Sequence, residues 1–192
     1  MKRTLGKSGL QVSALGLGCW AIGGPWTLHN GAQVIQAGWG QVDDAESLHA
    51  IQAGLDAGIT FFDTAANYGA GHSERLLGRA LQGKREQVVI ATKFGFLVDE
   101  AQRQISAAPD QILANLRADC ENSLRRLDTD YIDIYQLHDG SYDMAKAPEV
   151  MEVLESSWWP KARSAGTAGA RTTPSAPASL RLANTAPPTN ST

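Results

Sequence analysis

The sequence predicts an α/β protein of the (β/α)8 TIM-barrel class, of which about the first four βα units are present. Short apolar runs alternate with longer amphipathic runs, as they do in βα units. The apolar runs carry few alternating polar residues, which is typical of parallel strands covered on both faces. A doubly wound sheet is the alternative, but Gly16, Gly18, Gly23 and Gly24 lack its G-x-G-x-x-G spacing, so the barrel is favoured.

Four strands are expected where apolar, β-branched and aromatic residues follow one another without helical spacing. The first is a short apolar segment closed by glycines, and the second, ITFFDTA, is β-branched and aromatic. The third is QVVIATKFG and the fourth is YIDIYQLH. The expected bounds are 13–20, 59–65, 87–95 and 131–138.

Four helices are expected to follow the strands, because apolar residues recur there at helical spacing. The segment 43–58 has an Asp-rich, cap-like start, and the segment 73–83 begins with Ser73 as its predicted cap. A long helix is predicted over 109–127, and a fourth begins at 148 and reaches 156. Charged residues of the long helix are predicted to form a solvated face without special function: Arg117, Asp119, Glu121, Arg125 and Arg126.

Residues 157–192 differ in composition from the rest of the chain. They contain five of the eight prolines, four of the seventeen Lys and Arg residues, and none of the twenty Asp and Glu residues. Twenty-six of these thirty-six residues are Ala, Ser, Thr, Pro or Gly. We therefore expect two parts, a barrel segment over 1–156 and a low-complexity, disordered tail over 157–192.

Charge and cysteine content limit the function classes. The 192-residue chain has a net charge of −3, and its acidic body gives no reason to expect a nucleic-acid partner. Cys19 and Cys120 are too few and too far apart for a disulfide framework, which indicates a reducing compartment. The chain has neither an uninterrupted apolar signal segment at its start nor the roughly 18 apolar residues of a membrane span. We expect a soluble, cytoplasmic protein.

Polar residues stand at the ends of the predicted strands. Asp63 ends the second strand, Tyr68 lies in the loop after it, Lys93 ends the third and His138 ends the fourth. Each has an ordinary structural explanation when taken alone, but the carboxyl ends of consecutive barrel strands converge on one pocket. An ammonium beside a phenol favours the phenolate and makes the tyrosine a better acid. The group is therefore predicted to donate a proton to a developing alkoxide, without a nucleophile or a metal.

Three segments carry a resemblance to a known family: FFDTAANYG over 61–69, ATKFG over 91–95 and YIDIYQLH over 131–138. They resemble the aldo/keto reductase family, whose Asp, Tyr, Lys and His tetrad is matched one by one by the four residues at the strand ends. GKSGLQVSALGLGCW is similar to the family's amino-terminal hairpin and first strand, and GHSERLLGRAL is similar to its second helix. The resemblance covers residues 1 to about 156.

The resemblance implies a metal-free reduction of an aldehyde or ketone to an alcohol with NADPH, and NADH is left open. Tyr68 is then the proton donor, assisted by Asp63, Lys93 and His138. The implied cofactor-binding residues are Gly18, Cys19, Trp20 and Asp63. The insertion after the first strand, which contains Trp26, His29 and Trp39, is expected to be a loop that could line the substrate site. The sequence identifies neither the carbonyl compound nor the oligomeric state.

The tail replaces the Gly-Lys-Ile-Arg turn and fifth strand that the family would place after Glu155. Because Trp has a single codon, the bases of Trp158, Trp159 and Pro160 read as Val-Ala in the neighbouring frame, and allowed codons then give E-G-K-I-R. We expect a frameshift near residue 157 that truncates a reductase, leaving a chain with little or no activity of its own. Two functions other than that of an NAD(P)H-dependent reductase stay open for the protein. It could be an inactive truncated fragment, or a nicotinamide-binding regulatory subunit of the channel-associated type.

Overall fold

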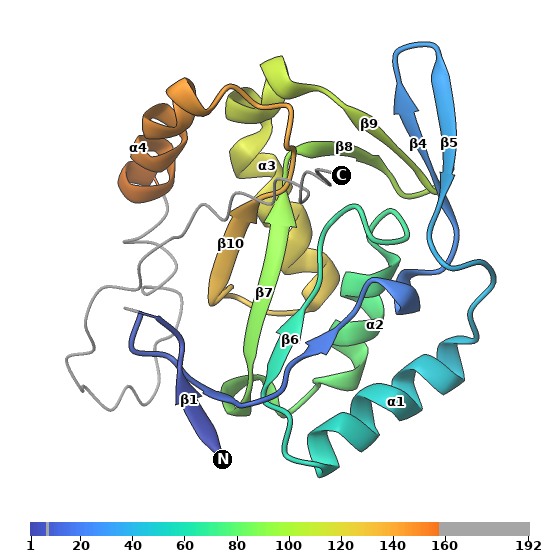
Figure 1. Ribbon diagram of the computed structural model, residues 1–192, viewed down its shortest axis with the longest axis vertical. Coiled ribbons are helices and arrows are strands. Elements are labelled where there is room, and N and C mark those ends of the chain that lie inside the picture. Colours follow the sequence, from blue (N-terminus) through green and yellow to red (C-terminus); the bar gives the residue numbers. More distant parts are fainter. Residues whose placement is uncertain (7, 158–192) are drawn as a thin grey trace, which may run out of the picture.

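The computed structural model describes residues 1–6 and 8–157, and its central feature is a four-stranded parallel sheet (Figure 1). The strands are β3 (Leu17–Gly18), β6 (Phe61–Asp63), β7 (Val89–Phe94) and β10 (Ile134–Leu137), in the spatial order β10-β7-β6-β3. Strands that follow one another in the sequence are thus neighbours in space. A doubly wound sheet reverses its strand order, whereas a barrel wall does not, so these strands form part of a (β/α)8 barrel.

Four α-helices connect and follow these strands and lie on one side of the sheet (Figure 1). Successive helices contact each other, α1 with α2, α2 with α3 and α3 with α4. The four predicted helices are therefore confirmed, with shifts of a few residues at their ends. Their bounds are Asp44–Asp56 for α1, His72–Ala80 for α2, Ile112–Leu127 for α3 and Ala147–Ser157 for α4.

The two predicted helix caps have different outcomes. Asp43 caps α1 as expected, because its Oδ1 accepts hydrogen bonds from the amides of Ala45 (2.7 Å) and Glu46 (3.0 Å). Ser73 does not cap α2, so that prediction is wrong. It lies inside the helix, and its hydroxyl is used to donate to the carbonyl oxygen of Cys19 at 2.7 Å. The helix follows Gly71, which has a left-handed backbone conformation.

The hydrophobic core lies between the sheet and its helices. Phe62 is completely buried among side chains of α1 and α2, while its neighbours Phe61 and Asp63 are only partly buried on the opposite face. A second cluster joins Phe94 and Tyr135 to α3 and α4. Because side chains alternate along a strand, burial of this face directs Asp63 towards the barrel interior. Lys93 lies two residues beyond Ala91, which pairs with Asp63, and therefore points to the same side. The core thereby orients the polar residues of the site.

Further strands lie at the two ends of the parallel sheet (Figure 1). β1 (Lys2–Thr4) and β2 (Gln11–Ser13) form the expected amino-terminal hairpin. A second four-stranded sheet, of order β5-β4-β9-β8, lies at the carboxyl ends of the parallel strands. The residues that form it are Trp26–Asn30 in β4, Gln33–Ala37 in β5, Phe96–Asp99 in β8 and Gln104–Ala107 in β9.

The second sheet was not predicted, and the insertion after the first strand is not a plain loop. Residues 26–37 form an antiparallel hairpin in which Asn30 pairs with Gln33. The two-residue turn between them begins with Gly31, whose φ of 59° suits the first position of a tight hairpin turn. A glycine at the first position of a two-residue loop, here Gly31, was the available signal for this hairpin.

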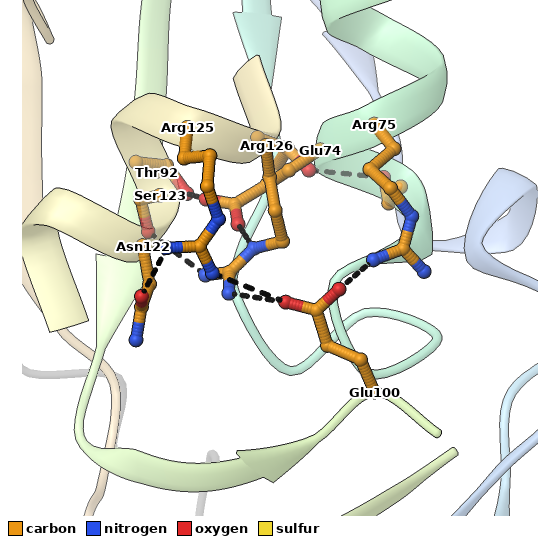
Figure 2. Close-up of polar contacts among 10 residues, drawn as sticks. Glu74, Arg75, Thr92, Glu100, Asn122, Ser123, Arg125 and Arg126 are labelled. Carbon is orange, nitrogen blue, oxygen red and sulfur yellow. Dashed lines mark hydrogen bonds and ion pairs between the residues drawn. The ribbon is translucent and has the colours of Figure 1, made fainter. Parts of the chain in front are cut away.

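The charged side chains of α3 do not all face solvent, as Figure 2 shows. Arg126 is 7% exposed, and its Nε donates to Oε2 of the fully buried Glu74 at 2.6 Å. Thr92 donates to the other oxygen of this carboxylate at 2.5 Å. The prediction of a solvated face is therefore wrong for Arg126, which links α3 to α2 through a buried ion pair. Arg125, one residue earlier, is exposed.

The tail expected over 157–192 lies outside the described residues, except for Ser157 at the end of α4. In the part of the chain that the structure describes, no helix is both long and apolar enough to cross a membrane.

Candidate active site

The four residues predicted to carry chemistry come from adjacent strand ends. Asp63 is the last residue of β6, Lys93 is the second-to-last of β7, and His138 directly follows β10. Tyr68 lies in the tight loop between β6 and α2, where its amide donates to the carbonyl oxygen of Ala65 at 3.1 Å. The structure brings all four together, at the end of the sheet where barrel enzymes hold their active sites.

The Lys93 ammonium is the centre of the group. Its Nζ donates to Oδ1 of Asp63 at 2.7 Å, to the carbonyl oxygen of Thr64 at 2.8 Å and to the hydroxyl oxygen of Tyr68 at 3.3 Å. An ammonium has three N–H groups, so these acceptors use all of them. The Lys93 side chain is 13% exposed and Asp63 is 39% exposed, which leaves the carboxylate at the rim. The charge is therefore fixed beside the phenol.

This arrangement determines what the Tyr68 hydroxyl can do. Because its oxygen accepts from Lys93, its own proton is free to be donated to another acceptor. The positive charge beside the oxygen stabilises the phenolate that remains after proton transfer. The geometry therefore suits proton donation to an oxygen that gains negative charge.

His138 lies across from Tyr68, with 5.7 Å between the ring centroids. Its amide donates to the carbonyl oxygen of Phe94 at 2.9 Å, and its Nδ1 lies 2.9 Å from Oδ1 of Asn67. Burial, reinforced by the charge of Lys93, lowers the pKa of His138 to about 4. The ring is therefore neutral at pH 7 and can take part as a hydrogen-bonding group.

The three residues expected to border a cofactor differ in exposure. Gly18 ends β3, and a Cβ placed on it would meet no atom within 4 Å, so space is open there. Cys19 is 0% exposed, and burial raises the pKa of its thiol to about 12. Its amide donates to the carbonyl oxygen of Asp63 at 2.8 Å and its carbonyl oxygen accepts from Ser73, so no part of Cys19 lies at the surface. Trp20 is 46% exposed and stands beside Tyr68, with 6.2 Å between the ring centroids.

Aromatic rings surround the phenol. Trp39, which follows the β4–β5 hairpin, packs edge to face on Trp20 at a centroid distance of 5.9 Å. Phe96 of β8 packs edge to face on His138 at 5.9 Å. The insertion thus brings Trp39 to the site. Trp26 is not brought there, because it is buried with Ala70 and Ile105 beneath the second sheet.

Sequence reasoning missed Asn67 and Phe96 as neighbours of His138. Asn67 directly precedes Tyr68 in the quoted motif, and Phe96 follows the third parallel strand after a single glycine. A polar residue next to a predicted catalytic residue was the only sequence signal for Asn67. Its partner is 71 positions away, so the contact depends on the tertiary fold.

No group of three or more His, Cys, Asp or Glu side chains is arranged to hold a metal ion within residues 1–6 and 8–157.

The fold and the site define part of a (β/α)8 barrel whose ionisable groups gather at the carboxyl ends of its strands. Residues 14–157 match the aldo/keto reductase family, and the chain belongs to this family. It is 39% identical over 155 residues to the aldo-keto reductase YhdN of Bacillus subtilis, a match that covers 79% of this chain and 42% of that protein. It is 32% identical over 154 residues to the uncharacterized oxidoreductase YqkF of the same organism, over 80% of this chain and 44% of YqkF.

Solved structures agree with this assignment. The holo form of an aldo-keto reductase from Bacillus halodurans matches with a TM-score of 0.62 and 30% identity, over 80% of this chain and 46% of that one. An aldo/keto reductase from Klebsiella pneumoniae in complex with NADP and acetate matches with a TM-score of 0.53 and 30% identity, over 77% and 43% respectively. The chain thus spans less than half the length of each of these four relatives.

Proposed function

We propose that the protein is an NADPH-dependent oxidoreductase that reduces aldehydes or ketones to alcohols, with Tyr68 as the proton donor. The observation that carries this proposal is the Lys93 ammonium, whose three hydrogen bonds hold it between the Asp63 carboxylate and the Tyr68 hydroxyl. Such a group stabilises the phenolate that proton transfer leaves behind. The barrel part is proposed to comprise residues 1–156.

The proton moves within this group. As the carbonyl oxygen gains negative charge, Tyr68 transfers its proton to it, so the phenol O–H bond breaks and the O–H bond of the alcohol forms. The phenolate that remains lies 3.3 Å from Lys93 Nζ, which stabilises it. Asp63 keeps the ammonium in position, and His138, as a neutral ring, forms a hydrogen bond with the reacting oxygen.

NADPH fits the rim next to this group. Relatives whose structures contain NADP or NADPH support this cofactor, and NADH is left open. The open space at Gly18, the exposed ring of Trp20 and the carboxylate of Asp63 are the parts of this chain that would border it. When bound, NADPH supplies a hydride to the carbonyl carbon.

The rings around the phenol favour a substrate with an apolar, preferably aromatic, group beside its carbonyl. Trp20 and Trp39 are 46% and 68% exposed, so their faces are available to a ligand. Exposed aromatic rings beside a few polar groups are typical of small-molecule sites.

We further propose that the protein acts in the cytoplasm, since Cys19 and Cys120 are free thiols.

The test compares the 192-residue chain with a chimera in which residues 1–157 are joined to the remainder of the Bacillus subtilis relative YhdN. NADPH consumption and alcohol formation are measured with a panel of aromatic and aliphatic aldehydes. The chimera is expected to form one alcohol per NADPH consumed. The chain alone is expected to show little or no turnover, because its described residues supply only four of the eight strands of a barrel.

Intact YhdN serves as the matched control. If YhdN is active and the folded chimera is not, these residues do not form a working site and the proposal is wrong. If the chimera binds NADPH without oxidising it for any aldehyde, a nicotinamide-binding regulatory role is favoured. Measurable turnover by the chain alone would contradict the expectation that four strands are insufficient.

A further inference from the structure

The turn between β8 and β9, residues 100–103, connects the second sheet to the helices outside the barrel wall (Figure 2). Its first residue is Glu100. Oε2 of this carboxylate accepts from Nη1 of Arg75 in α2, and Oε1 accepts from Nη1 of Arg126 in α3 at 3.1 Å. These two contacts, the Glu100 bridge, link one carboxylate of the second sheet to two helices of the barrel.

Arg126 gives the bridge a fixed end. The side chain is 5% exposed, and it also donates to Glu74 at 2.6 Å and to Ser123 at 3.2 Å. A planar guanidinium that uses all three nitrogen atoms in hydrogen bonds has little freedom to move. Glu74 in turn accepts from Thr92 of β7, the residue directly before Lys93. The bridge therefore ends on the barrel wall itself.

The last residue of the same turn, Arg103, reaches towards the candidate site. Its Nη2 donates to the carbonyl oxygen of Gly23 at 2.9 Å. A Cβ placed on Gly23 would lie 2.7 Å from the carbonyl carbon of Tyr68, so these two segments are in direct contact. Arg103 has a φ of 51°, which is uncommon for a residue other than glycine. The turn thus lies between the helices and the segment that contains the phenol.

The second sheet brings two aromatic rings to the site. Phe96, the first residue of β8, packs edge to face on His138 with 5.9 Å between the ring centroids. β9 pairs with β4 and β4 pairs with β5, which ends at Ala37, two residues before Trp39. Trp39 packs on Trp20. The positions of Phe96 and Trp39 therefore depend on the position of the whole sheet.

We propose that Glu100 is a positioning residue that, through Arg75 and Arg126, holds the second sheet against the barrel and so determines how tightly the site binds aromatic carbonyl compounds. What this states about substrates rests on the proposed function, whereas the attachment of the sheet does not. The bridge acts on rings that border the substrate and not on the contact between Lys93 and Tyr68. Its loss should therefore change KM more than kcat.

Hydrogen exchange of the 192-residue chain, followed by mass spectrometry, tests the attachment. Glu100→Gln replaces one acceptor oxygen with an NH2 group, which cannot accept from an arginine. Amides of β8, β9 and β4 are expected to exchange about 5- to 30-fold faster, while those of β6 and β7 keep their rates. A general loss of stability would instead raise the rates in both groups of strands.

Two variants of Arg75 test the bridge from its other side. Arg75→Met should have the same effect as Glu100→Gln, and Arg75→Lys, which keeps the positive charge, should largely restore the slow exchange. The Arg75 side chain is 38% exposed, so this pair of variants decides the question if Glu100→Gln does not fold. Arg125→Met is the matched control and should change nothing, because that guanidinium lies 3.9 Å from Glu100 and is 68% exposed.

The effect on substrates is measured in the chimera with YhdN. Glu100→Gln is expected to raise KM for aromatic aldehydes about 2- to 10-fold, as the loss of one aromatic contact would. KM for aliphatic aldehydes and kcat should each change less than about 2-fold.

Unchanged exchange in β8, β9 and β4, or an equal rise in β7, would overturn the proposal. An active chimera whose KM values for aromatic and aliphatic aldehydes rise alike, or stay the same, would also overturn it. The two proposals fail separately. Faster exchange confined to the second sheet, with a chimera that reduces no aldehyde, contradicts only the proposed function. An active chimera together with unchanged exchange contradicts only the role of Glu100.

Discussion

Replacing Arg126 with Met tests the buried ion pair that links α2 to α3. The Glu74 carboxylate is 0% exposed and the Arg126 side chain is 5% exposed, with 2.6 Å between Oε2 and Nε. Arg126 also donates to Glu100 at 3.1 Å and to Ser123 at 3.2 Å. Met fills much of the same volume but provides no charge, so the substitution leaves a buried carboxylate whose remaining hydrogen bond comes from Thr92.

The expected loss is about 3–5 kcal/mol in the free energy of unfolding, because an uncompensated buried charge is costly. Glu74→Gln should recover much of this loss in the Arg126→Met background. The amide still accepts from Thr92 and brings no charge into the interior. Urea unfolding at pH 7, followed by circular dichroism, measures each difference.

Arg125→Met is the matched control on the same helix. The Arg125 side chain is 68% exposed, and its guanidinium lies 3.9 Å from the Glu100 carboxylate, so the loss should stay below about 0.5 kcal/mol. The reasoning is refuted if Arg126→Met costs no more than Arg125→Met. It is also refuted if adding Glu74→Gln to Arg126→Met makes the protein still less stable.

Three further predictions concern the site. As the pH falls from 6.5 to about 4, the unfolded chain takes up a proton at His138 before the folded chain does. The free energy of unfolding therefore decreases over this range by up to about 3 kcal/mol. Burial raises the pKa of Asp119 to about 6, so this group stabilises the folded state as the pH falls. The contribution of His138 is therefore measured as the difference between urea titrations of the chain and of His138→Gln. Gly69→Ala should prevent correct folding of the Tyr68 loop, since φ is 62° there and the new Cβ would lie 1.9 Å from the carbonyl oxygen of Gly23; loss of the His138 signals seen by NMR checks this. Trp39→Ala in the chimera should raise KM for aromatic aldehydes about 2- to 10-fold with little change in kcat, the equivalent of one aromatic pair, and an unchanged KM would exclude Trp39 from the substrate site.

The parallel strands and their helices could be predicted because local sequence determines them. The apolar runs end close to Asp63, Phe94 and Leu137, and the Asp-rich segment before α1 indicated its cap. The predicted strands are each longer than the observed ones, since residues that flank a ladder share its composition without pairing. The second sheet was missed because β4 pairs with β9, about 77 residues away, and no local pattern carries that information.

Burial explains the other differences. The charges on α3 have a spacing that suits a solvated face, and only the position of α2 shows that Arg126 has a buried partner. Asn67 reads as a loop residue until β10 brings His138 to it. By contrast, the tetrad could be predicted because Asp63, Lys93 and His138 lie at the ends of parallel strands that are consecutive in both sequence and space, and Tyr68 lies in the loop after the first of them. Because consecutive strands of a barrel are adjacent in space, residues at their ends can be assigned to one site from the sequence alone.

The most direct test of the central claim is to compare the chimera with and without Tyr68→Phe. This variant removes the hydroxyl that accepts from Lys93 and keeps the ring. Turnover of an aldehyde should fall by about 10²–10⁴-fold, while the Kd for NADPH, measured by fluorescence titration, stays nearly unchanged. If Tyr68→Phe retains turnover, or loses it only in proportion to weaker NADPH binding, Tyr68 is not the proton donor.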